Sequence, residues 1–339
     1  MTVILGINAY HADASAALVI DGTLVAAAEE ERFARVKHVA GFPHQAIAYC
    51  LRAAGITPRE ITHIAVSRNP RARLHRKLLA LLAHPPRWDR IVSRMKNASR
   101  LQGVKTALAR GLDIDPRELR ASVHYVEHHR AHLASAFFVS GLEEAAVLSV
   151  DGMGDFVSTM WGIGRGSRME VLGAVPFPHS LGVLYTAVTQ YLGFPNYGDE
   201  YKVMGLSAYG EPIYRDRFRQ MVRMGDGLSY RLDLSYFTHH TDGVSMTWDE
   251  GAPVLGPLYS SKLIQAFGPP REPGAPLRSE HAQIAASLQA VLEEVLLTLL
   301  IRLSERTRVK ALCLAGGVAL NCVLNGKILR HTPFERLYI

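Results

Sequence analysis

The sequence of 339 residues is poor in cysteine and lacks any long uninterrupted apolar run. Its three cysteines, Cys50, Cys313 and Cys322, lie in apolar surroundings at no metal-ligand spacing, which excludes a cysteine zinc cluster and a disulfide framework. No apolar run approaches the roughly 20 residues that a membrane helix needs, and the N-terminus lacks the charged region of a signal peptide. We therefore expect a cytoplasmic protein with no membrane partner.

Acidic side chains are nearly absent from residues 68–110. This segment holds twelve lysines or arginines against one acid, a local balance of +11 in a chain whose net charge is +7, so the other residues carry −4. Helical stretches expected at 74–83 and 88–109, broken by Pro85-Pro86, predict a basic helical insertion at 68–120. Such a segment could bind an acidic partner such as phosphate or an acyl-carrier protein. The alternative is a helical face that is simply exposed to solvent. The lack of interleaved aromatic residues argues against nucleic acid.

Two histidines stand at helical spacing in the stretch Val126–Phe137, which is rich in alanine. His128 and His132, at i and i+4, would project from one helix face, where two imidazoles can share a cation. Asp151 follows the apolar run 145–150, expected as a buried strand, at an Asp-Gly turn. Two histidines and a carboxylate would form an open site for Fe(II), Zn(II) or Mn(II). The zincin pattern His-Glu-x-x-His is absent, and a surface histidine pair beside an ordinary hairpin is the alternative.

Each half of the chain opens with a strand, a polar loop and a returning pair of strands. The strands are expected at 3–8, 16–21, 24–28, 145–151, 156–163 and 169–175. This order predicts an α/β protein with the actin-like ATPase and sugar-kinase fold, built from two duplicated lobes at 1–67 and 121–339. An ordinary meander is the alternative. Helices are expected at 42–55, 181–192 and 279–306, whereas 211–280 is turn-rich and uninformative.

Several residues are candidates for binding a phosphate or a nucleotide. The turn 315–321 follows a buried strand expected at 309–314 and leads into a helix N-terminus, which attracts phosphate. The glycine-rich turn 151–155 would let backbone N–H groups approach an anion closely, and the stretch 196–210 places glycines around a lysine. The candidates are Gly152, Gly154, Lys202, Gly205, Gly316, Gly317 and Asn321.

His11 lies in the polar turn 8–15 after the first strand. Its unperturbed pKa near 6.5 suits a group that accepts a proton at neutral pH, although a lone loop histidine is often simply solvated. The charged run Glu29–His38 follows, and its basic side chains could gather around an anion or form a charged loop. His11 is our candidate for the general base.

Taken together, these motifs resemble the O-carbamoyltransferase family, which includes nodulation-protein and cephem and aminoglycoside antibiotic carbamoyltransferases. The matching stretches are collinear from residue 3 to residue 339: Gly6–Asn8 with His11–Leu18, Glu29–Phe33 with Lys37-His38, His128–His132, Asp151–Gly154, Lys202–Leu206 and Ala315–Asn321. The resemblance implies an actin-like N-terminal domain related to the transferase subunit of the tRNA threonylcarbamoyladenosine system.

The resemblance also implies roles for individual residues. It implies iron at His128, His132 and Asp151, acid–base work on the acceptor hydroxyl at His11, and nucleotide contact at the turn that ends in Asn321. A second domain in the family makes carbamoyl adenylate from carbamoyl phosphate and ATP. The first domain then transfers the carbamoyl group to a small-molecule alcohol.

The chain stops at Ile339, before the region where the family supplies a further aspartate ligand and the adenylate-forming domain. We therefore expect a truncated product or one half of a split enzyme, with the adenylate-forming domain acting in cis or in trans. The rivals are a tRNA threonylcarbamoyl transferase of the same fold and an incomplete nucleotide-binding module that needs a partner. No motif in the sequence identifies the hydroxyl compound that accepts the carbamoyl group.

Overall fold

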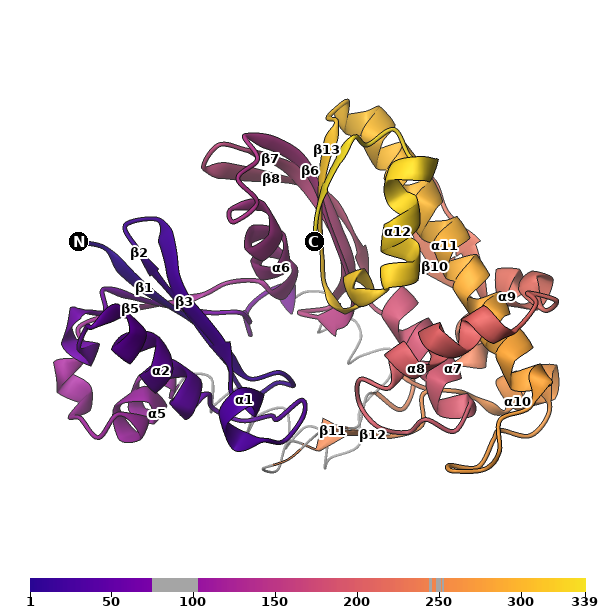
Figure 1. Cartoon of the computed structure of the whole chain (residues 1–339), viewed down its shortest axis with the longest axis horizontal. Coiled ribbons are helices and arrows are strands. Elements are labelled where there is room, and N and C mark those ends of the chain that lie inside the picture. The colour runs from indigo at the N-terminus through magenta and orange to yellow at the C-terminus, as the bar shows by residue number, and fades with distance from the viewer. Residues whose placement is uncertain (75–102, 244–245, 248–250, 252) are drawn as a thin grey trace. The chain divides into compact units, whose positions relative to one another are not determined.

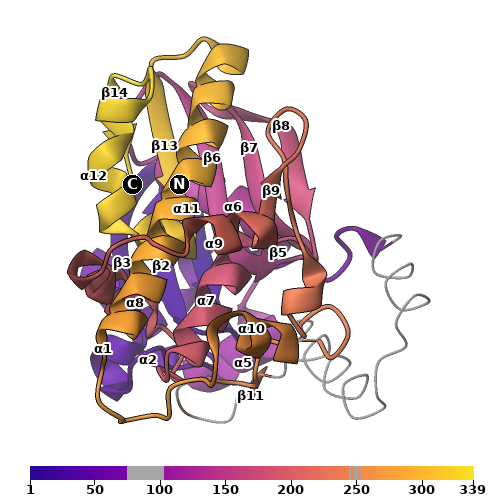
Figure 2. The ribbon, with the colours of Figure 1, turned by 90° about the vertical axis from the view of Figure 1, so that its right-hand side faces the viewer.

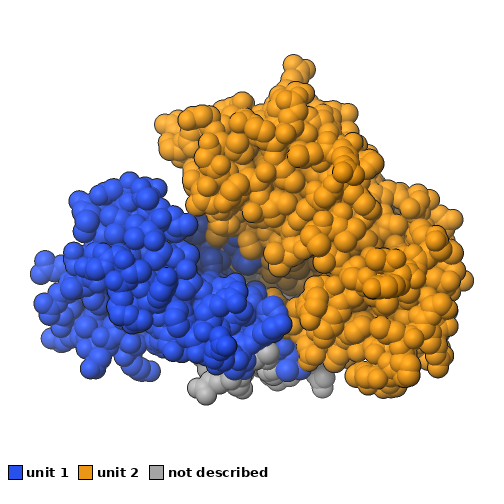
Figure 3. Space-filling model, viewed as in Figure 1, with its two compact units in different colours: residues 1–128, 245–255 blue, residues 129–244, 256–339 orange. Residues whose placement is uncertain are grey.

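The computed structural model describes residues 1–74, 103–243, 246–247, 251 and 253–339 (Figure 1). The helix predicted at 74–83 and most of the helix predicted at 88–109 lie outside these residues, and the end of the second falls in the described helix Val104–Gly111. The described chain divides into two compact units, coloured separately in Figure 3. Unit 1 comprises Met1–His128 and Ser245–Leu255, and unit 2 comprises His129–Val244 and Gly256–Ile339.

Unit 1 is built on a mixed sheet in the order β3-β2-β1-β4-β5. Its strands are β1 (Val3–Asn8), β2 (Ser15–Ile20), β3 (Thr23–Glu29), β4 (His63–Val66) and β5 (Ser122–Tyr125). The strand β1 pairs antiparallel with β2 and parallel with β4. Alternate residues of β1 point to the core, so that Val3, Leu5 and Ile7 are buried, as the period of two in a strand requires.

Helices complete unit 1: α1 (Glu31–Ala34), α2 (His44–Ala54) and α5 (Val104–Gly111), with short 3₁₀ turns η1 (Pro58–Glu60) and η2 (Pro116–Glu118). The helix α2 buries Ala46, Ile47, Cys50 and Leu51 at helical spacing against the sheet. It ends at Gly55, whose φ of 65° provides the left-handed cap that glycine favours. The predicted helix at 42–55 is therefore confirmed.

Unit 2 is built on a second mixed sheet in the order β14-β13-β6-β7-β8. These strands are β6 (Glu144–Gly154), β7 (Val157–Arg165), β8 (Arg168–Pro176), β13 (Ala311–Ala315) and β14 (Arg336–Tyr338). The strand β6 is antiparallel to β7 and parallel to β13. Matching the two sheets strand by strand gives the same order and directions in both, an antiparallel meander extended by two parallel strands.

Helices cover both faces of the unit 2 sheet, as Figures 1 and 2 show. The helices that follow β5 are α6 (His128–Phe137), α7 (Leu181–Tyr191), α8 (Glu200–Leu206), α9 (Arg215–Met221), α10 (Ser261–Phe267), α11 (Ser279–Thr307) and α12 (Cys322–His331), with 3₁₀ turns η3 (Ser207–Tyr209), η4 (Leu234–Tyr236) and η5 (Gly317–Leu320). Alternate residues of β6 join different cores: Ala145 and Val147 pack with α6, while Leu148 and Val150 pack with α7 and α11. This explains the uninterrupted apolar run at 145–150.

The helix α11 revises the expectation about apolar runs. It is long and apolar enough to cross a membrane, with an 18-residue window of mean hydropathy 1.9. However, 72% of that window is buried inside the structure, where residues such as Leu288, Leu292 and Leu299 form the core of unit 2. Such burial is typical of a core helix. The sequence analysis missed that α11 has the length and composition of a membrane helix, because charged residues interrupt its apolar run.

Three sequence-based boundaries need correction. The basic insertion predicted at 68–120 includes α5 and η2, and Val104 and Leu108 of α5 and Leu119, just after η2, belong to the unit 1 core. The second lobe was predicted to begin at 121, yet β5 pairs with β4 and the division falls after His128, because strand pairing keeps β5 in the first sheet. The segment 245–255, with β12 (Val254–Leu255), also groups with unit 1.

The segment 211–280, predicted to be turn-rich and uninformative, is well structured in its described part. Besides α9 and α10, it contains β9 (Val222–Met224), β10 (Tyr230–Leu232) and β11 (Met246–Thr247). Phe218, Tyr230, Phe237 and Leu263 are buried in the same core as α11. The prediction failed because these elements are too short for a clear period and are fixed by tertiary packing.

Candidate metal centre

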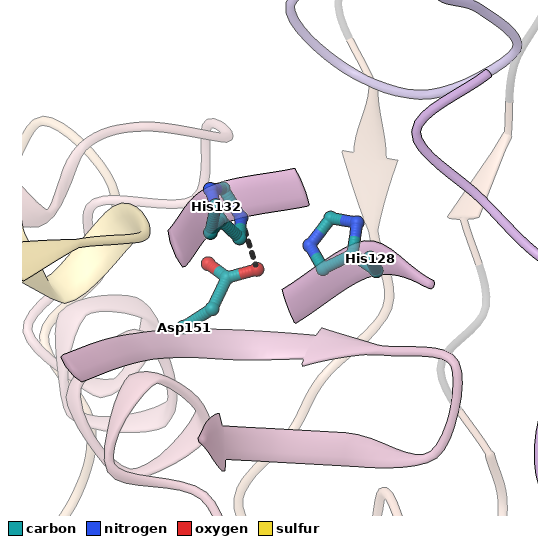
Figure 4. Close-up of side chains that lie close together, drawn as sticks. All are labelled: His128, His132 and Asp151. Atoms are coloured by element: carbon teal, nitrogen blue, oxygen red, sulfur yellow. Dashed lines mark ion pairs between the residues drawn. The ribbon is translucent and has the colours of Figure 1, made fainter. Parts of the chain in front are cut away.

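The side chains of His128, His132 and Asp151 lie together in the structure (Figure 4). The ligand atoms that they offer, one from each residue, all lie within 4.8 Å of one another. Nε2 of His132 is 3.6 Å from Oδ2 of Asp151. The helix α6 begins at His128, so both imidazoles project from its first turns, as the i, i+4 spacing predicts.

This donor set fits a divalent transition-metal ion. Nitrogen and oxygen donors at about 2.1 Å from one ion lie about 3.0 to 3.6 Å apart when the angle between them is about 90° to 120°. The separation of 3.6 Å between His132 and Asp151 falls at the upper end of that interval. All three residues are partly exposed. Two imidazoles and a carboxylate suit Fe(II), Zn(II) or Mn(II).

Asp151 lies inside β6 and not at its end, which corrects the predicted turn. The hairpin turn falls at Asp155 and Phe156, with φ of 47° and 66°, and joins β6 to β7. Between the pairs Val150↔Thr159 and Gly154↔Val157 the register shifts, so β6 carries extra residues there. A bulge of this kind re-aims side chains, and it places Asp151 toward α6. The Asp-Gly pair predicted a turn at Asp151, but the structure has the bulge there and the hairpin turn at Asp155.

The backbone of this bulge is held by the start of α7. The hydroxyl of Ser180 donates to the carbonyl of Asp151 at 3.1 Å and lies 2.5 Å from the carbonyl of Gly152. Ser180 also caps α7 by accepting from the amide of Val183. A Cβ on Gly182 would lie 2.7 Å from Gly152, so this approach requires glycine. Gly152 and Gly154 therefore lie in a strand packed against α7, and their predicted nucleotide contact stays a prediction.

His129 holds the histidine helix in place, and the sequence analysis missed it. Its ring is completely buried, with Nδ1 2.8 Å from the hydroxyl of Ser149 on β6 and Nε2 3.0 Å from the carbonyl of Val157 on β7. The carbonyl accepts, so Nε2 carries the proton and Nδ1 accepts from Ser149. Its ring centroid lies 5.9 Å from that of His132, and the sequence carries no separate signal for its role.

The Gly316-Gly317 turn lies directly against Asp151. The amide of Gly317 donates to Oδ1 of Asp151 at 3.1 Å. Gly316 has a φ of 93°, and a Cβ there would lie 2.4 Å from the carbonyl oxygen of Val150. The turn therefore passes so close to β6 that only glycine fits. It links two predicted sites: one contact joins the candidate nucleotide turn to a candidate metal ligand.

Asn321 is placed at the N-cap of α12, as the motif predicts, but its side chain serves the protein interior. Its Oδ1 accepts from the amide of Leu324 and from Nε2 of Gln289, and its Nδ2 donates to Oε1 of Gln289 at 2.8 Å. Gln289 on α11 also accepts from the hydroxyl of Tyr185, whose pKa is raised by burial and which therefore remains a donor. The predicted nucleotide contact of Asn321 stays a prediction.

Lys202 and Gly205 lie on α8 of unit 2. Nζ of Lys202 forms an ion pair with Oδ1 of the buried Asp199 at 2.6 Å, and this hydrogen bond raises the pKa of Lys202. Gly205 has open space at its Cβ position, so a close approach of another group does not require it. The predicted contact of Lys202 with a phosphate stays a prediction, and Asp199 competes for the same ammonium.

His11 lies in the loop after β1 in unit 1. Its ring is 5.9 Å from the ring of His128, measured between ring centroids, and its Nδ1 is 3.3 Å from the carbonyl of Ala12. The structure thus brings the candidate base beside a candidate metal ligand. Its role in proton transfer is untested by this geometry.

Comparison with known proteins identifies the family. The family model described as carbamoyltransferase N-terminus matches residues 3–339, so the chain belongs to that family. An uncharacterised protein of Synechocystis, sll1178, is 42% identical over 348 residues, which cover all of this chain and 54% of that protein. The nodulation protein NolNO of Sinorhizobium fredii is 37% identical over 336 residues, covering 98% of this chain and 44% of that protein. The resemblance drawn from the motifs is confirmed.

The chain spans about half the length of these two relatives. Among solved structures, component A of (R)-2-hydroxyglutaryl-CoA dehydratase from Acidaminococcus fermentans aligns over 99% of this chain and 91% of its own, with 12% identity and a TM-score of 0.48.

Proposed function

We propose that this chain is the transferase part of an O-carbamoyltransferase, which moves a carbamoyl group from carbamoyl adenylate to a hydroxyl of a small molecule. The observation that carries the proposal is the contact between the two candidate sites, in which Gly317 donates to Asp151 while Asp151 meets His132. A metal ion and a nucleotide held there would share one side chain. The family membership and the likeness to a nodulation protein support this reading.

The proposed fold is the actin-like ATPase and sugar-kinase fold with two duplicated lobes. The matching strand order of the two sheets supports it. Each unit has a candidate turn that follows a strand: the loop that carries His11 follows β1 in unit 1, and the Gly316-Gly317 turn follows β13 in unit 2.

In the proposed reaction the chain contributes binding and proton transfer. His11 accepts the proton of the acceptor hydroxyl as its oxygen attacks the carbamoyl carbon, and the bond from that carbon to the phosphate oxygen breaks so that AMP leaves with the electron pair. The backbone of the Gly316-Gly317 turn contacts the nucleotide while the Gly317 amide keeps its hydrogen bond to Asp151, and His128, His132 and Asp151 would hold the metal ion. When bound, such an ion supplies a Lewis acid that polarises an oxygen of the donor.

The proposed cofactors are Fe(II), with Zn(II) or Mn(II) as alternatives, and ATP with carbamoyl phosphate as the source of the donor. We propose that an adenylate-forming domain, in cis or in trans, makes carbamoyl adenylate. The acceptor is a small natural product with a hydroxyl group, as in antibiotic or other secondary metabolism, in the cytoplasm.

Metal analysis of anaerobically purified protein tests this proposal. Wild type is compared with His132→Ala and with the control His63→Ala, which removes a histidine of β4 outside the candidate site. We expect about one equivalent of metal in the wild type and the control, and its loss in His132→Ala. Equal metal in all three proteins would contradict the proposed centre.

A transfer assay with carbamoyl adenylate and a panel of sugars and aminoglycosides then tests the reaction. We expect AMP release that depends on the acceptor, and His11→Ala should keep metal and nucleotide but lose transfer. Transfer at the wild-type rate in His11→Ala would remove His11 from the mechanism. Salt-sensitive tRNA binding together with transfer to tRNA would instead favour the related RNA-modifying reaction.

A further inference from the structure

The charged run Glu29–His38 has no part in the function proposed so far, yet it lies against the His11 loop (residues 9–14). The segment that follows α1, here called the His38 loop (residues 35–41), runs beside the His11 loop. Two backbone hydrogen bonds join them: the amide of Tyr10 donates to the carbonyl of Gly41 at 2.7 Å, and the amide of Ala14 donates to the carbonyl of Val39 at 3.1 Å. The two motifs therefore form one structural element of unit 1.

Both loops contain residues in a conformation that side chains rarely adopt. Tyr10 and Asp13 of the His11 loop have φ of 57° and 60°, and Arg35 and His38 of the other loop have φ of 58° and 56°. None of them is glycine. Such residues persist where surrounding interactions determine the backbone, and they are concentrated at functional sites. The contacts that hold this conformation are therefore informative.

Side chains hold the strained residues together. Nδ1 of His38 lies 2.7 Å from Oδ1 of Asp13, and because a carboxylate only accepts, the imidazole donates. The amide of His38 donates to Oε2 of Glu31 on α1 at 2.8 Å. On the other side, Nδ2 of Asn8 donates to the carbonyls of Ala12 and Asp13. Asp13 is thus held through both its side chain and its carbonyl.

We propose that Asp13, Glu31 and His38 form a brace that positions the His11 loop, and that His38 is a positioning residue for proton removal by His11. His11 lies two residues before Asp13, and the centroid of its ring is 5.9 Å from that of the His128 ring. This inference rests on the proposed function of His11. A shift of about 1 Å in a reacting group lowers a rate on the order of 100-fold, so a brace of this kind matters for kcat.

The same three side chains also place possible ligand atoms within 4.8 Å of one another. We assign a brace and not a second metal site, because Nδ1 of His38 and the carboxylate of Asp13 already bond each other. The metal analysis separates the two readings. One equivalent in the wild type, retained in Asp13→Asn, supports the brace, whereas a second equivalent that Asp13→Asn loses would overturn it.

Hydrogen exchange tests the brace without any need for activity. His38→Ala removes the donor, while His38→Asn keeps an amide donor near the position of Nδ1 and tolerates a positive φ. We expect the amides of Tyr10 and Ala14 to exchange about tenfold faster in His38→Ala and at nearly the wild-type rate in His38→Asn. The control His63→Asn alters a histidine of the same unit that pairs with His124. Unchanged exchange in His38→Ala would overturn the brace.

The transfer assay tests the link to His11. In His38→Ala we expect kcat to fall on the order of 10- to 100-fold with KM for carbamoyl adenylate nearly unchanged, and His38→Asn to recover most of the loss. A variant that exchanges faster but keeps the wild-type kcat would overturn the positioning role. If the wild type itself transfers nothing, the proposed function fails, and the exchange result then decides the brace by itself.

Discussion

The His11 loop of unit 1 follows β1, and the Gly316-Gly317 turn of unit 2 follows β13, whose counterpart in unit 1 is β4. The two turns are held in different ways. The His11 loop uses residues with side chains at positive φ and is braced by partly exposed groups such as Asp13 and His38. The Gly316-Gly317 turn uses glycine at φ 93° and is pressed against the backbone of β6.

The difference shows how each loop can respond to change. A turn held by backbone contact has almost no room to move, because packed interiors do not deform gradually. A loop held by exposed hydrogen bonds costs less to open, since water can replace each bond. We therefore expect changes near the Gly316-Gly317 turn to act first on stability, and changes near the His11 loop to act first on rate.

The largest expected effect comes from Gly316→Ala. Its Cβ would lie 2.4 Å from the carbonyl oxygen of Val150, so β6 or the turn must shift. We expect a loss of about 3 kcal/mol or more in the free energy of unfolding, measured with denaturant, and weaker binding of ATP.

Gly22→Ala is the matched control in unit 1. Gly22 has a similar φ of 86°, but nothing lies within 4 Å of its Cβ position. It should lose about 1 kcal/mol, the conformational cost without the clash. Equal losses in the two variants would show that close contact at Gly316 contributes nothing.

Acid should expose a second contrast between buried and exposed groups. His239 of unit 2 is completely buried, and burial lowers its pKa to about 4 from 6.5. Between these values the unfolded chain binds the proton and the folded chain does not, so stability falls as pH drops from about 6.5 to about 4. The loss is on the order of 3 kcal/mol and levels off below pH 4. Chemical unfolding at several pH values measures it.

His239→Phe should reduce this acid dependence. The ring of His239 already contacts Phe177 and Phe237, so an apolar ring has suitable neighbours, although the hydrogen bond to the carbonyl of Pro178 is lost. Some dependence remains, because burial also lowers the pKa of His179. An unchanged slope between pH 4 and 6.5 would contradict the assignment to His239.

The next effect in size concerns Gln289, whose side chain exchanges hydrogen bonds with Asn321, just after the Gly316-Gly317 turn. Gln289→Leu leaves the buried amide of Asn321 and the hydroxyl of Tyr185 without their partner. We expect a loss of about 2 kcal/mol in unfolding free energy.

A double-mutant cycle with Asn321→Leu identifies the interaction. If the two amides act as a pair, the double variant loses clearly less than the two single losses combined. Strict additivity would mean that the pair contributes nothing of its own. A lower affinity for ATP in Gln289→Leu would further link α11 to the turn.

Much of the fold was predictable because it rests on local patterns. The strands β1 to β3, β6 to β8 and β13 and the helices α2, α7 and α11 follow from period, composition and turn residues. The pairing of β5 with β4 was not predictable, because the strand is short and its neighbour lies more than 50 residues earlier. The same holds for α9 and α10, whose burial depends on contacts with α11.

The candidate site shows the same limit. The i, i+4 spacing predicts that His128 and His132 share a face, and the structure places Asp151 beside them. The bulge that aims Asp151 and the bond from Gly317 could not be read from the sequence, since both arise where β6 meets other elements. His129 and Gln289 were missed because a buried polar residue is recognisable only by its partners.

The smallest expected loss of stability comes from Ser180→Ala. This variant tests what holds Asp151 in place next to the Gly316-Gly317 turn. Ser180→Ala removes the cap of α7 and the hydrogen bond to the carbonyl of Asp151. We expect a loss of about 1 kcal/mol in stability. If the bulge of β6 aims Asp151, metal affinity should fall on the order of tenfold as well, measured by competition with a chelator.

The control Ser260→Ala removes the cap of α10, which is outside the candidate site, and should lose similar stability without losing metal. Equal metal affinity in both variants would show that backbone packing by Gly182 is enough to place Asp151.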